Sequence, residues 1–375
     1  MNPSVRQISG SLIRQTAALK RPSSIDLGLG EPSLLPERSH LDAAIRSARE
    51  KGLRYTPNAG DESLREAIAA HYGYPGLDRP ENAIVTVGSQ EAMFAALVTL
   101  LDPANDELLV VEPAFPSYAK MAALGGVAVR RVAMAERDDF AFDAERIAGA
   151  LSERTRAIVL CSPCNPTGRT ISSDQAFALA RVLEAGGSAV TLIHDEIYRE
   201  QTYAERVDLA RIYPNTIAVN SLSKSNALTG LRLGWMLAPA PFVEQAVKVH
   251  AWMVSCADSF AQCVALHIFE NNALGEHASW YARRLQPILE TLHGSGLRFI
   301  VPEGSFYACI RLPEGVQSRD AAYALVDEHD VVTIPGVAFG DCFEGWLRLS
   351  WVAPLDRFRE GLARIATFVE SRTAG

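Results

Sequence analysis

The stretch AIVTVGSQEAMFAALVTLL, residues 83–101, contains the structural unit that decides the fold. Its first part, Ile84–Val87, is a short apolar run rich in β-branched residues, which predicts a strand. The turn Gly88-Ser89-Gln90 follows, and the apolar run Gln90–Leu101 is long enough to form a helix. A strand that passes through a tight turn into a helix is part of a βαβ unit, so this stretch favours an α/β fold.

The same alternation of short β-branched runs and longer helical patterns continues as far as Leu237. Alternation over this length predicts an open, mostly parallel sheet with helices on both faces, in which ligands bind at the carboxyl ends of the strands. The predicted strands are Ile84–Val87, Leu108–Val111, Ala128–Val132, Ala157–Leu160, Val190–His194, Thr216–Asn220 and Leu233–Leu237. The predicted helices between them include Gln90–Leu101, Asp143–Leu151 and Asp174–Ala185.

The pattern changes after Pro241, where the remainder of the chain predicts a smaller α+β domain. Its predicted elements are helical stretches near Pro241–His250 and Ser259–Glu290, short strands at Phe306–Arg311 and Trp346–Leu349, and a final helix over Leu355–Ser371. The N-terminal segment is rich in Pro and Gly, which predicts an extended arm. We therefore expect an arm over residues 1–40 that packs with the small domain, a large domain over 41–260 and a small domain over 261–375.

The composition argues against several classes of protein. The chain has 375 residues with 36 Lys and Arg against 44 Asp and Glu, so its formal net charge is −8. A net negative charge argues against nucleic acid or an anionic membrane as the main partner. The longest apolar stretch, around Ala92 to Leu101, is too short to cross a bilayer, and the first residues lack the apolar core of a signal peptide. We therefore expect a cytoplasmic protein.

The segment SLSKSNALTGLRLG, residues 221–234, carries the most informative chemistry. The amine of Lys224 can condense with a carbonyl, and Arg232 with a nearby hydroxyl can hold a phosphate. Together they suit a cofactor that carries both groups, and pyridoxal phosphate is such a cofactor. The same lysine also completes the Ser-x-x-Lys pattern of serine acyl-transfer enzymes. Those enzymes need Ser-Asp-Asn and Lys-Thr-Gly as well, and neither tripeptide occurs in the chain.

Polar residues also follow other predicted strands. Gly88-Ser89-Gln90 opens a helix whose free backbone N–H groups suit a phosphate. Asn165-Pro166-Thr167-Gly168 is either a simple turn or a source of an amide donor to a phenolate-type oxygen. His194-Asp195-Glu196 suggests a metal site, but neighbouring residues in a strand point to opposite faces, so we expect no metal. We expect instead that Asp195 pairs with a protonated ring nitrogen and that Tyr198 donates to a ring oxygen, although a strand-end cap with a core tyrosine is the alternative.

With these motifs in this order, the chain resembles the class I/II aminotransferases, the aspartate aminotransferase superfamily of fold-type I pyridoxal-phosphate enzymes. The resemblance runs from about Ile25 to the final helix. It implies a large cofactor-binding domain whose mostly parallel sheet lies between helices, and a smaller α+β domain. It also implies an enzyme that moves an amino group from an L-amino acid to a 2-oxo acid by a ping-pong mechanism, with 2-oxoglutarate as the expected acceptor.

The resemblance also implies a role for each residue around the cofactor ring. Lys224 holds the cofactor as a Schiff base and then moves a proton between the substrate and the cofactor. Asp195 pairs with the pyridine nitrogen, while Tyr198 and Asn165 bind the phenolic oxygen. Phe115 stacks on the ring.

The remaining implied roles concern the phosphate and the substrate. Arg348 binds the substrate α-carboxylate, and the backbone at Gly30 approaches the same group, with Asn165 beside it. Tyr55 reaches the phosphate of the neighbouring subunit, which predicts a homodimer with active sites at the interface. Tyr118 is a second candidate for stacking on the ring. The phosphate ligands are the backbone N–H groups of Ser89 and Gln90, the Ser221 hydroxyl and the Arg232 guanidinium.

Three alternatives stay open at this point. The same active site supports β-elimination, as in carbon–sulfur lyases, or ring closure, as in aminocyclopropane-carboxylate synthases. A cofactor-sensing domain without catalytic activity is the third, although no DNA-binding segment fits before Ile25. The sequence does not name the substrate. The residues considered for contact with its side chain are Leu12, Ile13, Ser255, Cys256 and Asp258.

Overall fold

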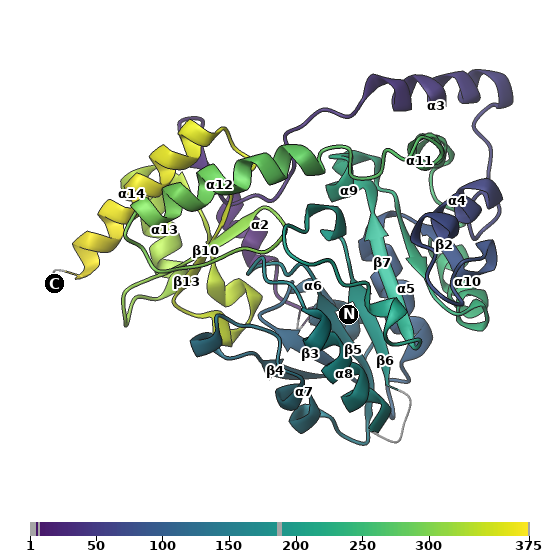
Figure 1. Cartoon of the computed structure of the whole chain (residues 1–375), viewed down its shortest axis with the longest axis horizontal. Helices are drawn as coiled ribbons and strands as arrows, with labels where there is room; N and C mark the ends of the chain where they lie inside the picture. The colour runs from purple at the N-terminus through teal and green to yellow at the C-terminus, as the bar shows by residue number, and fades with distance from the viewer. Residues whose placement is uncertain (1–4, 7, 186–189, 374–375) are drawn as a thin grey trace.

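A computed structural model describes residues 5–6, 8–185 and 190–373, and its largest element is a seven-stranded sheet. The strand order is β2-β8-β7-β6-β5-β3-β4 (Figure 1). Only β8 runs against the others, since it pairs antiparallel with both β2 and β7, so the prediction of a mostly parallel sheet is confirmed. The strands are β2 Ala83–Thr86, β3 Glu107–Glu112, β4 Ala128–Ala133, β5 Thr155–Cys161, β6 Thr191–Asp195, β7 Thr216–Ser221 and β8 Gly234–Leu237.

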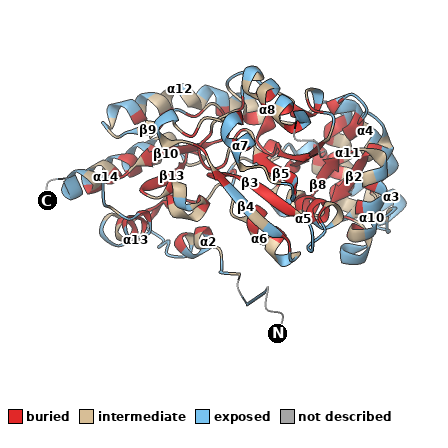
Figure 2. Cartoon of the chain, turned by 90° about the horizontal axis from the view of Figure 1, so that it is seen from below, coloured by how far each residue is buried: buried red, intermediate tan, exposed pale blue. Residues whose placement is uncertain are grey.

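Helices cover both faces of this sheet, which explains why its strands read as continuous apolar runs. Neighbouring residues of β5 show the alternation: Ile158 packs in one buried cluster with α7 and α8, and Val159 packs in another with α5, α6 and α10. Figure 2 shows the strands as mostly buried between half-exposed helices. These helices are α5 Gly88–Leu100, α6 Ser117–Leu124, α7 Ala144–Ala150, α8 Ser173–Ala185 and α10 Ala240–Val254.

A second, four-stranded sheet has the order β12-β13-β10-β9 and is antiparallel. Several of its apolar residues, among them Ile310, Leu347 and Leu349, share a buried cluster with three of the helices that follow α11. The strands are β9 Phe299–Ile300, β10 Tyr307–Arg311, β12 Ile334–Pro335 and β13 Trp346–Ser350, and the helices are α12 Ala278–Gly294, α13 Ser318–His329 and α14 Leu355–Thr373.

The division of the chain at residues 40 and 260 stays a prediction. Residue 260 lies inside α11, Ser259–Glu270, which packs with α3, Arg38–Lys51, and α4, Glu62–Tyr72. The helical stretch predicted over Ser259–Glu290 is interrupted. The chain leaves α11 through a turn in which Asn272 and Gly275 take φ values of 52° and 76°, and such left-handed values end a helix.

The N-terminal segment is more ordered than a plain extended arm. It contains the short helix α2, Leu12–Ala17, and the strand β1, Ile25–Asp26, which pairs in parallel with β11, Val331–Val332. Ile13 of α2 joins the same buried cluster as Ile334 of β12. None of the helices in the described part of the chain combines the length and the apolar character that a membrane span requires.

The reversed direction of β8 places one functional loop entirely at the carboxyl edge of the sheet. The last residue of β7, Ser221, pairs with the first residue of β8, Gly234. Residues 222–233 therefore leave the sheet and return to it at the same edge, and they include the short helix α9, Leu222–Ser225.

Candidate active site

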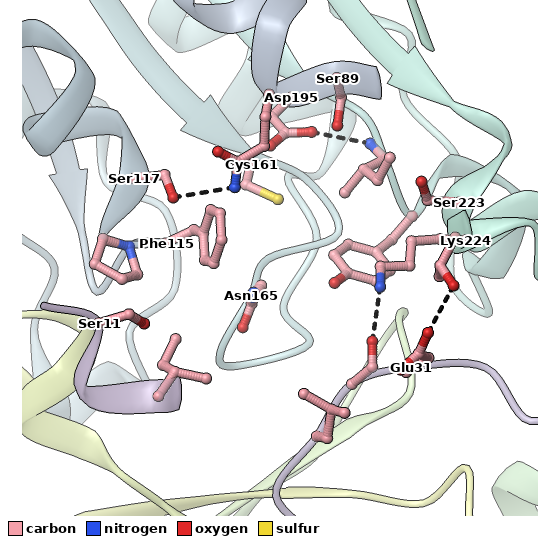
Figure 3. Close-up of a pocket in the computed structure, with 18 of the residues that line it drawn as sticks. Ser11, Glu31, Ser89, Phe115, Ser117, Cys161, Asn165, Asp195, Ser223 and Lys224 are labelled. Carbon is pink, nitrogen blue, oxygen red and sulfur yellow. Dashed lines mark hydrogen bonds between the residues drawn. The ribbon is translucent and has the colours of Figure 1, made fainter. Parts of the chain in front are cut away.

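A cavity of about 600 Å³ lies at this carboxyl edge and is lined by residues from both sheets and the arm (Figure 3). Ten of the twelve predicted site residues line it, although they are spread over more than 300 positions of sequence. They are Gly30, Ser89, Gln90, Phe115, Asn165, Asp195, Tyr198, Lys224, Arg232 and Arg348.

Lys224 enters the cavity from α9, which Ser221 caps by accepting a hydrogen bond from the Ser223 N–H at 3.2 Å. The Lys224 Nζ donates to the carbonyl oxygen of Gly30 at 2.7 Å. Burial lowers the pKa of Lys224 to about 8, with a smaller opposing effect from Glu31, because a charged amine is costly to desolvate. Roughly a tenth of the Lys224 side chains are therefore neutral at pH 7.

Asp195 ends β6 and points into the cavity. Its Oδ2 accepts from the Tyr118 hydroxyl at 2.5 Å and its Oδ1 from the Ile197 N–H at 3.2 Å. Burial raises the pKa of Asp195 to about 6, so the carboxylate is still ionised at neutral pH. Its chain neighbours face the other side of the strand, where His194 Nδ1 lies 3.6 Å from Glu196 Oε2. The strand thus separates Asp195 from the groups that first suggested a metal site.

Tyr198 and Asn165 approach the cavity beside Arg348. The Tyr198 hydroxyl lies 3.0 Å from the hydroxyl of Tyr307, and burial raises the pKa of Tyr198, so its hydroxyl keeps its proton. Arg348 donates to Asn165 Oδ1 at 2.9 Å and to the carbonyl oxygen of Gly28 at 2.6 Å. Its guanidinium lies over the Tyr307 ring, 4.2 Å from the ring centroid.

The first turn of α5 and Arg232 form a cradle with room for an anion. The first N–H groups of a helix have no partner within the helix, and here they belong to residues that line the cavity, Ser89 and Gln90. A Cβ on Gly88 would lie 2.7 Å from Arg232 Nη2, and a Cβ on Gly234 would lie 2.5 Å from the Ser89 nitrogen. Only glycines allow this close approach.

Phe115 lies beside the cavity, and its ring meets that of Tyr118 edge-on with 6.0 Å between the centroids. Tyr118 is buried and bonded to Asp195, a role that the sequence did not suggest. Two predicted residues do not line the cavity. Ser221 is buried and its hydroxyl caps α9, and Tyr55 is 89% exposed on the loop before α4. Their predicted roles stay predictions.

Of the residues considered for the substrate side chain, Ile13 lines the cavity and the other four do not. Asp258 instead caps α11 by accepting from the Ala261 N–H at 2.7 Å. The structure adds cavity residues to which the sequence analysis gave no role. Glu31 and Ser223 are close neighbours of predicted residues, while others, such as Ser11, Arg14 and Tyr307, lie far from any motif.

The fold and the site together define a class of protein. A lysine with a lowered pKa, a buried carboxylate at a strand end and an anion cradle on one sheet edge are features of fold-type I pyridoxal-phosphate enzymes. The family model for class I and II aminotransferases matches residues 22–365. The chain belongs to this family, as the resemblance predicted, and it is an aminotransferase.

Individual relatives match over almost the whole chain. A Bacillus subtilis protein named "Probable N-acetyl-LL-diaminopimelate aminotransferase" is 34% identical over 98% of this chain and 95% of its own length. The aspartate aminotransferase of Pyrococcus horikoshii is 32% identical over 94% of this chain and 92% of its own length. The structure of Thermus thermophilus aspartate aminotransferase with maleate superposes with a TM-score of 0.91, at 30% identity, over 98% of this chain and 99% of that one.

Proposed function

We propose that this protein transfers the amino group of an L-amino acid to a 2-oxo acid, with pyridoxal phosphate held in the cavity around Lys224. One observation carries the proposal: a lysine whose pKa is lowered to about 8 shares the cavity with a carboxylate that is ionised at neutral pH. The amine suits condensation with a carbonyl. The carboxylate suits a ring nitrogen that has to stay protonated.

The residues present fit this cofactor at each of its ends. Its dianionic phosphate matches the cradle of Ser89 and Gln90 N–H groups and Arg232. Gly88 and Gly234 add no side chain that would push these groups apart. The Phe115 ring supplies an apolar surface for the aromatic ring. When bound, pyridoxal phosphate supplies an aldehyde that condenses with amines and a ring that withdraws electrons from the substrate α-carbon.

Lys224 then has two tasks in sequence. Its amine would hold the cofactor, and the low pKa would favour this because only a neutral amine is nucleophilic. The same Nζ would also serve as the base that moves the proton of the substrate α-carbon. The hydrogen bond to Gly30 keeps the side chain beside the arm.

Asp195 would hold the cofactor ring, and Arg348 would hold the α-carboxylate of the substrate. The Asp195 carboxylate, held by Tyr118 and the Ile197 N–H, would keep the ring nitrogen of the cofactor protonated. The planar guanidinium of Arg348 suits bidentate binding of the substrate α-carboxylate. Asn165 and Gly28 hold that guanidinium in place.

The acceptor is expected to be 2-oxoglutarate, and the two half-reactions to follow each other in a ping-pong order. The visible absorption of the cofactor-loaded protein tests this. We expect a band that bleaches with an amino-acid mixture and returns with 2-oxoglutarate. A band that persists, or release of pyruvate and ammonia without an acceptor, would contradict transamination and favour a sensor or a lyase.

The rate at which Lys224 captures pyridoxal phosphate is expected to follow its lowered pKa. Since the neutral amine attacks, the rate should rise about tenfold per pH unit below pH 8 and level off above it, whereas an unperturbed lysine would continue to about pH 10.4. Stopped-flow absorbance measures this rate. Capture by Nα-acetyl-lysine in the same buffers corrects for the cofactor's own titration. A rate that still rises tenfold per unit at pH 9.5 would contradict the lowered pKa.

We propose that the protein acts as a homodimer in which Tyr55 of each subunit reaches the cofactor phosphate of the neighbouring subunit. Tyr55 is 89% exposed and Trp252, near the end of α10, is 92% exposed. Their segments are joined, because Asn58 donates to the carbonyl oxygen of Ser255 at 2.6 Å. Large aromatic side chains exposed on adjoining segments are typical of an interface, and sedimentation velocity measures the mass.

A further inference from the structure

A buried histidine and a buried glutamate lie behind the phosphate cradle, and the proposed function uses neither of them. The Nδ1 of His250, on α10, lies 2.8 Å from the Oε1 of Glu91, in the first turn of α5. The His250 side chain is fully buried and the Glu91 side chain is 8% exposed. Burying such groups is costly, and a functional site beside them can account for that cost.

The Glu91 carboxylate uses both of its oxygens outside the cavity. Its Oε2 accepts from the N–H of Val87 at 2.8 Å, the residue just before α5, and its Oε1 faces His250. An ionised carboxylate only accepts hydrogen bonds, so the His250 Nδ1 carries the proton of this bond. The other ring nitrogen, Nε2, is buried and has no hydrogen-bond partner in the described part of the chain. Within that part, the hydrogen bonding of the ring serves Glu91 alone.

Glu91 lies where a carboxylate could interfere with a phosphate. Side chains of a helix lean toward its N-terminus, and the free N–H groups of Ser89 and Gln90 are there. Such N–H groups and the helix dipole attract a carboxylate of the first turn. If the Glu91 carboxylate turned toward them, it would occupy donors of the cradle, and its charge would repel the phosphate dianion. The bonds to Val87 and His250 hold it away from the cavity, which Glu91 does not line.

The position of His250 is fixed by the packing of α10 against α5. Val243 and Ala246 of α10 share a buried apolar cluster with Met93 and Leu97 of α5, and Figures 1 and 2 both show the two helices side by side. His250 follows Ala246 by four residues, so it lies on the same face of α10. The imidazole therefore reaches Glu91 from a packed helix.

We infer that His250 is a positioning residue for the cofactor phosphate. It holds the Glu91 carboxylate away from the first turn of α5, and the N–H groups of that turn stay free for the phosphate. His250 touches neither cofactor nor substrate and acts through Glu91. The inference rests on the proposed function. It assigns part of the affinity for a phosphorylated cofactor to a residue outside the cavity.

The test compares pyridoxal phosphate with pyridoxal, which lacks the phosphate. Absorbance titration of the protein freed of cofactor gives both dissociation constants, and their ratio isolates the contribution of the phosphate. We expect His250→Leu to lower the preference for pyridoxal phosphate about tenfold, because a charge beside the phosphate is released. His250→Asn should keep the preference within about threefold, since its amide N–H can replace the Nδ1 donor. His293→Leu removes an exposed imidazole from α12 and serves as the matched control.

Variants of Glu91 separate positioning from a general effect on the fold. In a Glu91→Gln background, which has no charge to hold away, His250→Leu should change the ratio by less than about threefold. Glu91→Asp keeps the charge but is one methylene too short for its two partners. It should lower the preference about as much as His250→Leu, without removing a buried ring. The thermal transition of each variant checks its folding, and Glu91→Asp decides alone if His250→Leu does not fold.

Two results would overturn the role of His250. One is a change of less than about threefold in both His250→Leu and Glu91→Asp, and the other is an equal loss from His250→Leu with and without Glu91→Gln. A loss of the same size in His293→Leu would also overturn it. Failure of the unmodified protein to bind pyridoxal phosphate would instead overturn the proposed function.

Discussion

Replacing Lys224 with alanine is expected to lower the rate of transamination by at least about four orders of magnitude. The variant loses both the amine that binds the cofactor carbonyl and the base that moves the α-proton. No other described side chain of the cavity offers a neutral amine, since the remaining basic groups are Lys120, which is bonded to the arm, and three arginines. Single-turnover absorbance with glutamate measures the loss.

The cofactor should nevertheless remain bound to Lys224→Ala, because the phosphate cradle and Asp195 are unchanged. Retention after gel filtration therefore separates loss of chemistry from loss of binding. Lys248→Ala is the matched control, because Lys248 lies exposed on α10 and donates only to Gln245, at 2.7 Å. A Lys224→Ala rate within a hundredfold of the unmodified protein would show that the lysine has been assigned wrongly.

Asp195→Asn is expected to lower kcat by about three orders of magnitude, which corresponds to about 4 kcal/mol of activation free energy. The substitution keeps the shape of the side chain and removes the charge that holds the ring nitrogen protonated. The two carboxylate oxygens of Asp195 accept from Tyr118 and from the Ile197 N–H, and an amide has a single oxygen, so one of these hydrogen bonds is lost. The thermal transition of the variant therefore has to be measured to check its folded structure.

The neighbouring residue provides a strict control for this substitution. Burial raises the pKa of Glu196 to about 8, so its carboxyl is neutral at pH 7, and Glu196→Gln removes no charge. Its Oε2 accepts from Tyr74 at 2.8 Å on the far side of the strand. We expect Glu196→Gln to change kcat by less than about twofold. An equal loss in both variants would indicate damage to the strand end rather than loss of the ring charge.

The inner strands of the central sheet were predictable because each is short, apolar and buried on both faces, whereas the edge strand β4 is largely exposed and was marked by its β-branched residues. The reversed direction of β8 was not predicted, since an apolar run reads the same in either direction. A signal was present, however. Residues 222–233 contain no helical pattern long enough for a parallel crossover, so an antiparallel return was the simpler expectation.

The site was predictable where its residues lie at a strand end, as Asp195 does, or a few residues after one, as Asn165 and Lys224 do. Contacts between distant segments left no local signal. Tyr118 lies 77 positions from Asp195, and the sequence suggested only a stacking role for it. Arg14 was missed for a related reason: a cation on a short amphipathic helix looks like an ordinary surface residue until the fold places it at a cavity.

The pairing between β7 and β8 also determines where the loop that carries Lys224 and Arg232 begins and ends. The pairing of Ser221 with Gly234 closes a single loop that carries both Lys224, which faces the carbonyl end of the proposed cofactor, and Arg232, which faces its phosphate. Both anchors thus belong to one short loop whose two ends are tied to adjacent strands of the sheet. A change in the length of this loop would therefore be expected to disturb both ends of the proposed cofactor at once.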